Sequence, residues 1–152
     1  MTERQDCNSL LLDNQLCFPL YASARKIVAA YHPFLKKLGL TYSQYVTMMV
    51  LWEEKNITMH ELGRRLYLDS GTLTPVLKKL EKAGYVTRAR MEEDERVVVL
   101  DVTEKGMALE RQALSVPEAM RCLINQKGPL FTPEELDTLK KQLYRLIDAL
   151  EG

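Results

Sequence analysis

The sequence predicts a mainly α-helical protein that carries one β-hairpin. Two observations predict this class. Along most of the 152 residues, apolar side chains recur at spacings of three and four, which is typical of helices that pack on one face. Near residues 85–100 this period gives way to two β-branched runs, which are typical of strands. Because 46% of the chain is hydrophobic and 28% is charged, we expect one folded domain over residues 1–152.

The first long helix is expected over residues 13–39. Asp13 is a suitable N-cap, and Gly39 is a suitable stop. Pro19 lies inside this stretch and has no N–H to donate, so the helix either restarts there or bends. One stripe of the helix holds Leu20, Ile27, Tyr31, Phe34, Leu35 and Leu38.

Three shorter helices are expected next. Ser43 is predicted to cap the first of them, which is apolar nearly all round and therefore central to the core. Thr58 begins the second, and Asp69 or Ser70 caps the third, which Gly84 ends. Their inward side chains are expected to be Val46, Met49, Val50 and Trp52, then Leu62 and Leu66, then Leu73, Val76, Leu77 and Leu80.

A hairpin and two further helices complete the chain. The strands are expected at residues 85–88 and 97–100, with a charged connection between them. Thr103 begins a helix that is predicted to run until Pro117 interrupts it. After a break at Gly128, residues 132–135 combine a cap, a proline and an acid, and so begin the last helix.

Three short helices followed by a hairpin form a winged helix-turn-helix, here over residues 43–102. Long helices remain at both ends, over residues 13–39 and 103–150. Their apolar stripes are more than this central part can cover, so we expect them to dimerise the chain. The alternative is that the two end regions bury each other within one subunit.

The distribution of charge favours a nucleic-acid partner, although the net charge is zero. Residues 57–91 hold seven basic and three acidic side chains, a balance of +4, whereas residues 92–100 have a balance of −3. A neutral protein with a basic middle can bind a polyanion through that part alone. The alternative is that these charges only keep the helices soluble.

The predicted recognition helix begins with small polar side chains and continues with lysines. Hydroxyls of Ser70, Thr72 and Thr74 would meet base edges and phosphates in the major groove, while Lys78 and Lys79 would reach the flanking backbone. Taken singly, Ser70 and Thr72 could serve only as helix caps.

Arg96 lies in the hairpin connection, where an arginine can enter the minor groove of DNA while Asp94 holds its guanidinium group in place. The alternative is a solvated turn with a weak ion pair. The four acids of residues 92–95 would repel DNA unless they point away from it.

Four motifs together carry a family resemblance that covers nearly the whole chain. They are residues 12–21 (LDNQLCFPLY), 40–45 (LTYSQY), 68–75 (LDSGTLTP) and 94–96 (DER). The chain resembles the MarR-type winged-helix repressors, and specifically the OhrR branch that senses organic hydroperoxides. The resemblance implies a homodimer that represses a peroxide-detoxification gene at a pseudo-palindromic operator. It also implies that the basic middle, including Arg88, and Arg96 contact double-stranded DNA.

Cys17 is the expected redox sensor. It lies within about one turn of a helix start, where the helix dipole favours a thiolate that can attack a hydroperoxide. The resemblance implies that Tyr31 and Tyr42 stabilise this thiolate by hydrogen bonds. It also implies that Cys122 captures the oxidised sulfur of the partner subunit as a disulfide, unless a small external thiol does so. Without the resemblance, Cys17 and Cys122 would be interpreted as packed core thiols, and Cys7 is interpreted as incidental.

Several other functions are disfavoured or remain as alternatives. A thiol peroxidase would need a βαβ framework, and this sequence predicts only one hairpin. A repressor gated by a small aromatic ligand, a sensor of another oxidant or electrophile, and a helical adaptor remain open. Three scattered cysteines and two histidines predict neither a metal site nor a disulfide scaffold, and we expect no cofactor. With no apolar run long enough for a membrane span, the chain is expected to be cytoplasmic.

Overall fold

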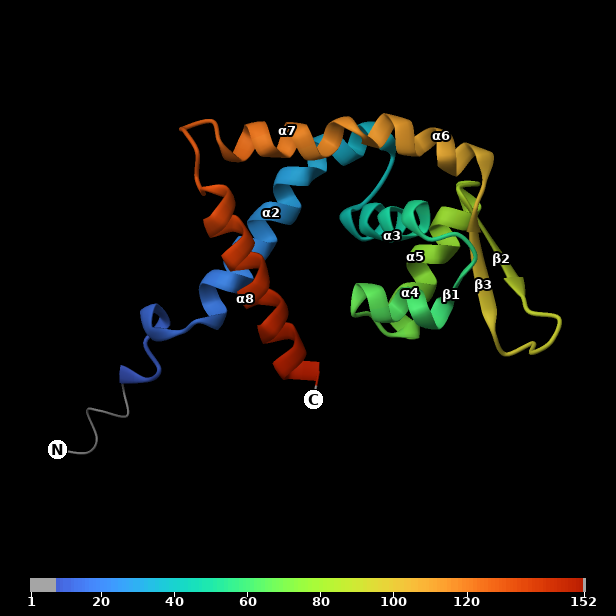
Figure 1. The fold of residues 1–152 in the computed structure, drawn as a ribbon, viewed down its shortest axis with the longest axis horizontal. Helices are drawn as coiled ribbons and strands as arrows, with labels where there is room; N and C mark the ends of the chain where they lie inside the picture. The colour runs from blue at the N-terminus through green and yellow to red at the C-terminus, as the bar shows by residue number, and fades with distance from the viewer. Residues whose placement is uncertain (1–7, 152) are drawn as a thin grey trace. The chain divides into compact units, whose positions relative to one another are not determined.

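The computed structural model describes residues 8–151 and has the expected mainly helical architecture with a small antiparallel sheet (Figure 1). The chain divides into two compact units, Met1–Val116 and Pro117–Gly152. The first unit holds the three short helices and the sheet, and the second holds most of helix α7 (Ser115–Ile124) and all of α8 (Pro133–Glu151).

The long first helix, α2, spans Cys17–Leu38 and ends at Gly39, whose φ of 69° is in the left-handed region. Asp13 does not cap it, because Asp13 lies in a separate 3₁₀ turn, η1 (Leu12–Asn14). The helix begins without a side-chain cap, and Pro19 is accommodated in the first turn, where its missing N–H leaves no hydrogen bond unmade. The helical path that the sequence predicted from Asp13 is thus interrupted at residues 15–16 and restarts as α2 two residues before Pro19.

The three short helices are α3 (Tyr42–Glu53), α4 (Met59–Leu66) and α5 (Ser70–Lys82). Thr41 caps α3, not Ser43, because its side chain bonds the N–H of Gln44, whose own side chain accepts from the N–H of Thr41. The predicted caps of the other two are confirmed. Thr58 caps α4 in the same reciprocal manner, and Asp69 caps α5.

The sheet has the strand order β1–β3–β2. The hairpin strands are β2 (Val86–Arg90) and β3 (Val98–Val102), each beginning one residue later than expected. The sequence analysis missed β1 (Ile57–Thr58), which pairs Ile57 with Leu100 at the outer edge of β3. This third strand ties the start of α4 to the hairpin, and so fixes the wing relative to the helix-turn-helix.

Three helices follow the sheet. Thr103 caps α6 (Glu104–Ala113), as expected, but the helix ends at Leu114 and not at Pro117. Pro117 lies in the first turn of α7 (Ser115–Ile124), a position that proline tolerates. The last helix, α8 (Pro133–Glu151), begins with the predicted reciprocal bonds between Thr132 and Glu135.

A single cluster of buried side chains joins α3, α4, α5 and the sheet in the first unit. Its most buried members are Leu35, Met48, Leu51, Leu62, Leu73, Leu77, Leu80 and Leu100. Trp52 of α3 adds a hydrogen bond of 3.0 Å from its indole N–H to the Gly106 carbonyl of α6. Burial of this kind contributes about 1.5–3 kcal/mol for each large side chain, so the recognition helix is held as part of the core.

Candidate functional site

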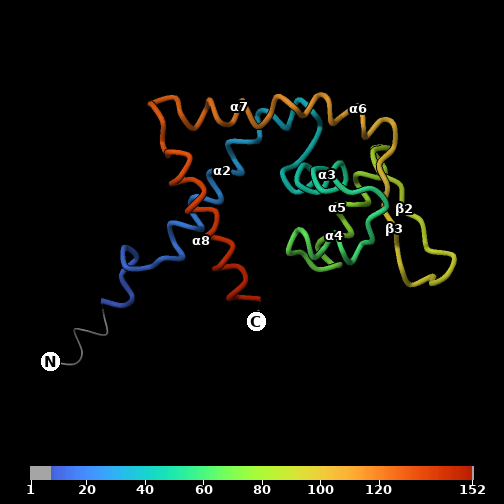
Figure 2. The backbone as a smooth tube through the Cα atoms, viewed as in Figure 1, coloured from blue at the N-terminus to red at the C-terminus, as the bar shows by residue number. Residues whose placement is uncertain are grey.

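The turn between α4 and α5, which the tube of Figure 2 traces, packs back against the backbone of α4. A Cβ added to Gly63 would lie 2.7 Å from the carbonyl oxygen of Leu68, so only glycine fits at this position. The N–H of Leu68 returns to the Gly63 carbonyl at 2.9 Å. Tyr67 completes the turn in the left-handed region, with a φ of 53°. These contacts fix the angle at which α5 leaves α4.

One face of α5 is free for a ligand because the opposite face is buried. Leu73, Leu77 and Leu80 are buried, whereas Gly71 and Pro75 are exposed on the other side. Both exposed residues are compact, and Pro75 has no N–H to donate to the carbonyl of Gly71, so this one backbone acceptor lies open near the start of the helix. The sequence analysis did not single out these two residues, although the motif at residues 68–75 contained them.

The hydroxyls and lysines that the sequence predicted for DNA contact also lie on α5. Ser70, Thr72, Lys78 and Lys79 are exposed. The Thr74 hydroxyl donates to the Ser70 carbonyl at 2.7 Å, so it faces a ligand only as an acceptor. Asp69 accepts from the N–H of Thr72 at 2.7 Å, and these hydrogen bonds lower the pKa of its carboxyl. The cap is therefore ionised at neutral pH.

Two of the seven basic side chains of residues 57–91 are held in ion pairs. Arg65 is neutralised by ion pairs with Glu53 and Glu54 at the end of α3. Arg88 of β2 pairs with Glu81 of α5 at 2.8 Å and is half-buried, so it is less free for DNA than the sequence suggested. Within residues 8–151, by contrast, the lysines at 78, 79 and 82 enter no ion pair.

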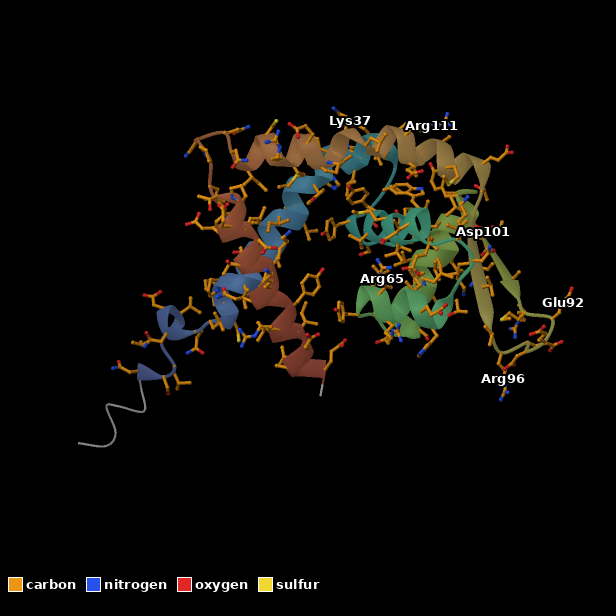
Figure 3. The ribbon with its side chains drawn as sticks, viewed as in Figure 1. Lys37, Arg65, Glu92, Arg96, Asp101 and Arg111 are labelled. Atoms are coloured by element: carbon orange, nitrogen blue, oxygen red, sulfur yellow. The ribbon has the colours of Figure 1, made fainter. Side chains whose placement is uncertain are left out.

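Arg96 lies at the tip of the hairpin, where its side chain is 91% exposed and points away from the strands (Figure 3). Asp94 accepts from both the backbone N–H and the Nε of Arg96, at 3.0 and 3.1 Å, and these bonds lower the pKa of Asp94. Arg90 donates to the Glu95 carbonyl at 2.7 Å and stiffens the loop. Glu92 also lies in this loop, and its side chain points in a different direction from that of Arg96 (Figure 3). The predicted pairing of Asp94 with Arg96 is present.

Cys17 is the first residue of α2 and is exposed. Its surroundings are apolar, because Leu16, Phe18 and Tyr21 expose 67%, 44% and 59% of their surface. Over residues 17–29, nearly every side chain of α2 is exposed in the single chain, whereas the end of the helix packs on α3 and α6. The thiol thus lies on an apolar surface that one subunit does not cover.

Tyr31 and Tyr42 form an aromatic cluster with Tyr45. The ring centroids of Tyr31 and Tyr42 are 5.1 Å apart, and Tyr45 lies 5.9 Å from Tyr31. Burial raises the pKa of the Tyr31 and Tyr45 hydroxyls, so both remain protonated donors at neutral pH. The sequence analysis named the first two tyrosines and missed Tyr45.

The cluster does not lie beside Cys17 of the same chain. Tyr31 follows Cys17 by 14 residues on the same helix, which is a rise of about 21 Å at 1.5 Å per residue. Because the Tyr42 ring lies 5.1 Å from the Tyr31 ring, it is comparably distant from Cys17. Within a single subunit, therefore, the hydrogen bonds from Tyr31 and Tyr42 to the thiol that the resemblance implies cannot form.

Cys122 is exposed on α7, where its thiol donates to Glu118. It belongs to the second unit, and Cys17 belongs to the first. Cys7, the remaining cysteine, lies outside the described residues. In the part of the chain that the structure describes, no group of His, Cys, Asp and Glu could hold a metal ion, and no helix is both long and apolar enough to span a membrane.

A small cavity of about 230 Å³ opens between α5 and the hairpin. Glu81, Arg88, Ala89, Arg90 and Val98 line it, so its walls carry three charged side chains. Neither Cys17 nor the tyrosine cluster contributes to it. Such a lining does not suit the aromatic ligand of the alternative repressor mechanism.

Comparison with known proteins identifies relatives that cover nearly all of the chain. Residues 29–112 match the family described as transcriptional regulator SarA/Rot. The organic hydroperoxide resistance transcriptional regulator of Bacillus subtilis is 47% identical over 139 residues, which are 91% of each chain. Reduced AbfR bound to DNA has a TM-score of 0.78 at 31% identity and covers 97% of this chain and 99% of its own. A MarR variant of E. coli in complex with operator DNA has a TM-score of 0.75 at 25% identity and covers 86% and 92%.

Proposed function

The chain belongs to the MarR-type family of winged-helix transcriptional regulators, alongside the organic hydroperoxide resistance regulators, and from this premise we propose that it is a DNA-binding repressor that oxidation of Cys17 releases from its operator. It is a regulator and not an enzyme. The observation that carries the redox part of the proposal is the exposed Cys17 at the first residue of α2, set among uncovered apolar side chains.

The DNA-binding part of the proposal uses α5 and the hairpin. The open face of α5 would enter the major groove with its first turn, while Lys78 and Lys79 bond phosphates. Arg96, held by Asp94, would enter the adjacent minor groove. Reduced AbfR and the E. coli MarR variant are both bound to DNA in their structures, which supports this use of the shared fold.

The thiol part of the proposal requires a second subunit. The rise of about 21 Å between Cys17 and Tyr31 excludes their contact within one α2 helix. In a two-fold dimer, contacts are reciprocal, so two antiparallel α2 helices would place each Cys17 near Tyr31 and Tyr42 of the other subunit. Midway between positions 17 and 31, residues 22–24 are Ala, Ser and Ala, which would let two helices approach closely. Dimerisation would also cover the exposed apolar surface of α2.

The chemistry begins when the Cys17 thiolate attacks an organic hydroperoxide. The sulfur takes the terminal hydroxyl oxygen, the O–O bond breaks, and the alkoxide leaves as an alcohol once it takes a proton. The apolar surroundings of Cys17 favour an organic oxidant over hydrogen peroxide. Cys122 of the partner subunit then captures the sulfenic acid as a disulfide. This bond would displace the two recognition helices from their half-sites.

The proposal is tested by the anisotropy of a labelled duplex from the region upstream of the gene. Reduced protein is titrated onto the duplex, and one equivalent of cumene hydroperoxide is then added. We expect tight binding and then release, whereas a Cys17→Ser variant should bind equally well and stay bound. A variant that still lets go would contradict the thiol mechanism and favour a ligand-gated repressor. Absence of binding even at low salt would contradict the assignment of this duplex as the operator.

A non-reducing gel of the same samples follows the second cysteine. Oxidised wild-type protein is expected to run as a disulfide-linked dimer, and Cys122→Ser as a monomer. A dimer band that persists in Cys122→Ser would assign the bond to another cysteine, such as Cys7.

A further inference from the structure

Helix α7 carries a cluster of three side chains that the proposed function uses only in part. Glu118, Arg121 and Cys122 lie three and four residues apart and therefore on one side of the helix. The Cys122 thiol donates to Oε1 of Glu118 with a sulfur–oxygen distance of 3.5 Å. All three residues belong to the same unit of the chain, so their mutual geometry is defined.

Arg121 fixes the carboxylate of Glu118 in a forked arrangement. Its Nε donates to one carboxylate oxygen at 2.8 Å, and its second guanidinium nitrogen donates to the other at 2.6 Å. These hydrogen bonds lower the pKa of Glu118, and the groups that act on its carboxyl are Arg121 and Cys122. At neutral pH the carboxylate is therefore ionised, held in place and already in contact with the thiol proton.

We propose that Glu118 accepts the proton of the Cys122 thiol while the Cys122 sulfur attacks the sulfenic acid of Cys17. This inference rests on the proposed function. The S–H bond breaks, and its proton passes to Oε1 of Glu118. The electron pair left on the Cys122 sulfur forms the S–S bond, and the S–O bond of the sulfenic acid breaks. The departing hydroxide takes up that proton, so the products are one disulfide and one water, with the hydroperoxide as the oxidant already consumed.

A second ion pair of the same unit shows what the cluster adds. Lys141 and Asp137 of α8 form an exposed pair at 2.7 Å with a spacing of four residues. Such pairs contribute little to stability, and the pair of Glu118 with Arg121 is equally exposed. The two ion pairs differ in that the carboxylate of Glu118 also accepts a hydrogen bond from the Cys122 thiol. Asp137→Asn is thus a matched control for the loss of one helical ion pair and one negative charge.

The experiment separates the two oxidation steps in the full-length dimer. Wild-type, Glu118→Gln and Asp137→Asn proteins are mixed with one equivalent of cumene hydroperoxide, quenched with acid at set times, and analysed by mass spectrometry for the disulfide. The first step is measured separately in a Cys122→Ser background, with and without Glu118→Gln, by trapping the sulfenic acid with dimedone.

Glu118→Gln is expected to leave sulfenic acid formation unchanged and to slow disulfide formation roughly 10- to 100-fold at pH 6.5. General bases usually accelerate a reaction by about 100-fold or more, and the effect here is expected to be no larger than that because water reaches the site. The pH profile supplies a second readout. If Glu118 takes the proton directly from the thiol, the rate of disulfide formation should change little with pH as long as the carboxylate stays ionised. In Glu118→Gln the attack depends on a free thiolate, so the rate should instead rise steeply with pH.

Asp137→Asn should match the wild type in both steps. Disulfide formation that is equally fast or faster in Glu118→Gln overturns the role of Glu118. A faster reaction would mean that the negative charge of Glu118 only disfavours the thiolate of Cys122. A wild-type protein that forms a sulfenic acid but no Cys122 disulfide overturns both this role and the resolving step. A wild-type protein that forms neither overturns the thiol mechanism as well.

Discussion

Gly63→Ala is expected to damage DNA binding more than its loss of stability accounts for. The added methyl would lie 2.7 Å from the Leu68 carbonyl oxygen, a backbone atom that cannot rotate away. Relief requires a shift of about 0.5 Å in the turn that joins α4 to α5, and overpacking of this kind costs about 1–3 kcal/mol of unfolding free energy. Because Leu73 and Leu77 hold α5 in the core, the strain is expected to tilt the helix rather than release it.

The matched control is Gly39→Ala, which lies at the end of α2. Its φ of 69° is costly for alanine by about 1 kcal/mol, yet a Cβ there meets no atom within 4 Å. Urea unfolding followed by circular dichroism gives the stability of each variant, and duplex anisotropy gives the affinity of the folded protein. We expect both variants to lose stability and only Gly63→Ala to lose affinity, by tenfold or more. Equal affinities in the two variants would refute the argument that this close approach sets the angle of the recognition helix.

Four further predictions follow from the described contacts. Arg96→Ala should lower operator affinity about tenfold and leave the melting temperature unchanged, because the side chain is 91% exposed; an unchanged anisotropy titration would exclude Arg96 from the interface. Lys78→Ala should weaken binding to all duplexes alike and reduce the slope of log affinity against log salt by about 1, which a salt titration measures. Tyr67→Gly should raise the free energy of unfolding by about 1 kcal/mol in urea, since glycine adopts the φ of 53° freely; a loss would show that the ring contributes more than the strain removes. The hydrogen bonds that Asp69 accepts as the cap of α5 lower the pKa of its carboxyl on folding. The stabilisation is therefore complete above the pKa of the unfolded state and is lost as the pH falls through the pKa of the folded state. The difference in melting temperature between wild type and Asp69→Asn should accordingly shrink in acid.

The sequence predicted a helix cap correctly where one candidate residue precedes the helix, and it misplaced the cap where two candidates lie close together. Thr58, Thr103 and Thr132 cap helices as expected, because in each case the backbone N–H of the third following residue donates to the threonine hydroxyl. Ser43 was preferred to Thr41 although both are cap residues, and the decisive partner was Gln44, which only Thr41 can reach reciprocally.

Long-range features were less predictable. Strand β1 has two residues, which are too few for a period, and it exists because Leu100 of β3 lies opposite Ile57. The fork of Arg88 with Glu81 joins β2 to α5 and likewise depends on the tertiary fold. Hence the sequence predicted Arg88 only as a DNA contact, and the structure shows its guanidinium group paired with Glu81.

The separation of Cys17 and Tyr31 along α2 follows from the sequence once both residues are assigned to one helix. A helix that places Cys17 at its first residue and Tyr31 about 21 Å further on cannot bring them together, whatever else the chain does. If the thiol and the tyrosines do act together, the sensor exists only in the dimer, and each site spans both subunits. Within its own unit, the half of α2 that carries Cys17 is exposed, whereas the other half packs on α3 and α6. Oxidation would then act first on the contact between subunits, and α2 would pass that change to the helices that support α5. A chemical event on one sulfur can in this way alter the spacing of two recognition helices without unfolding either.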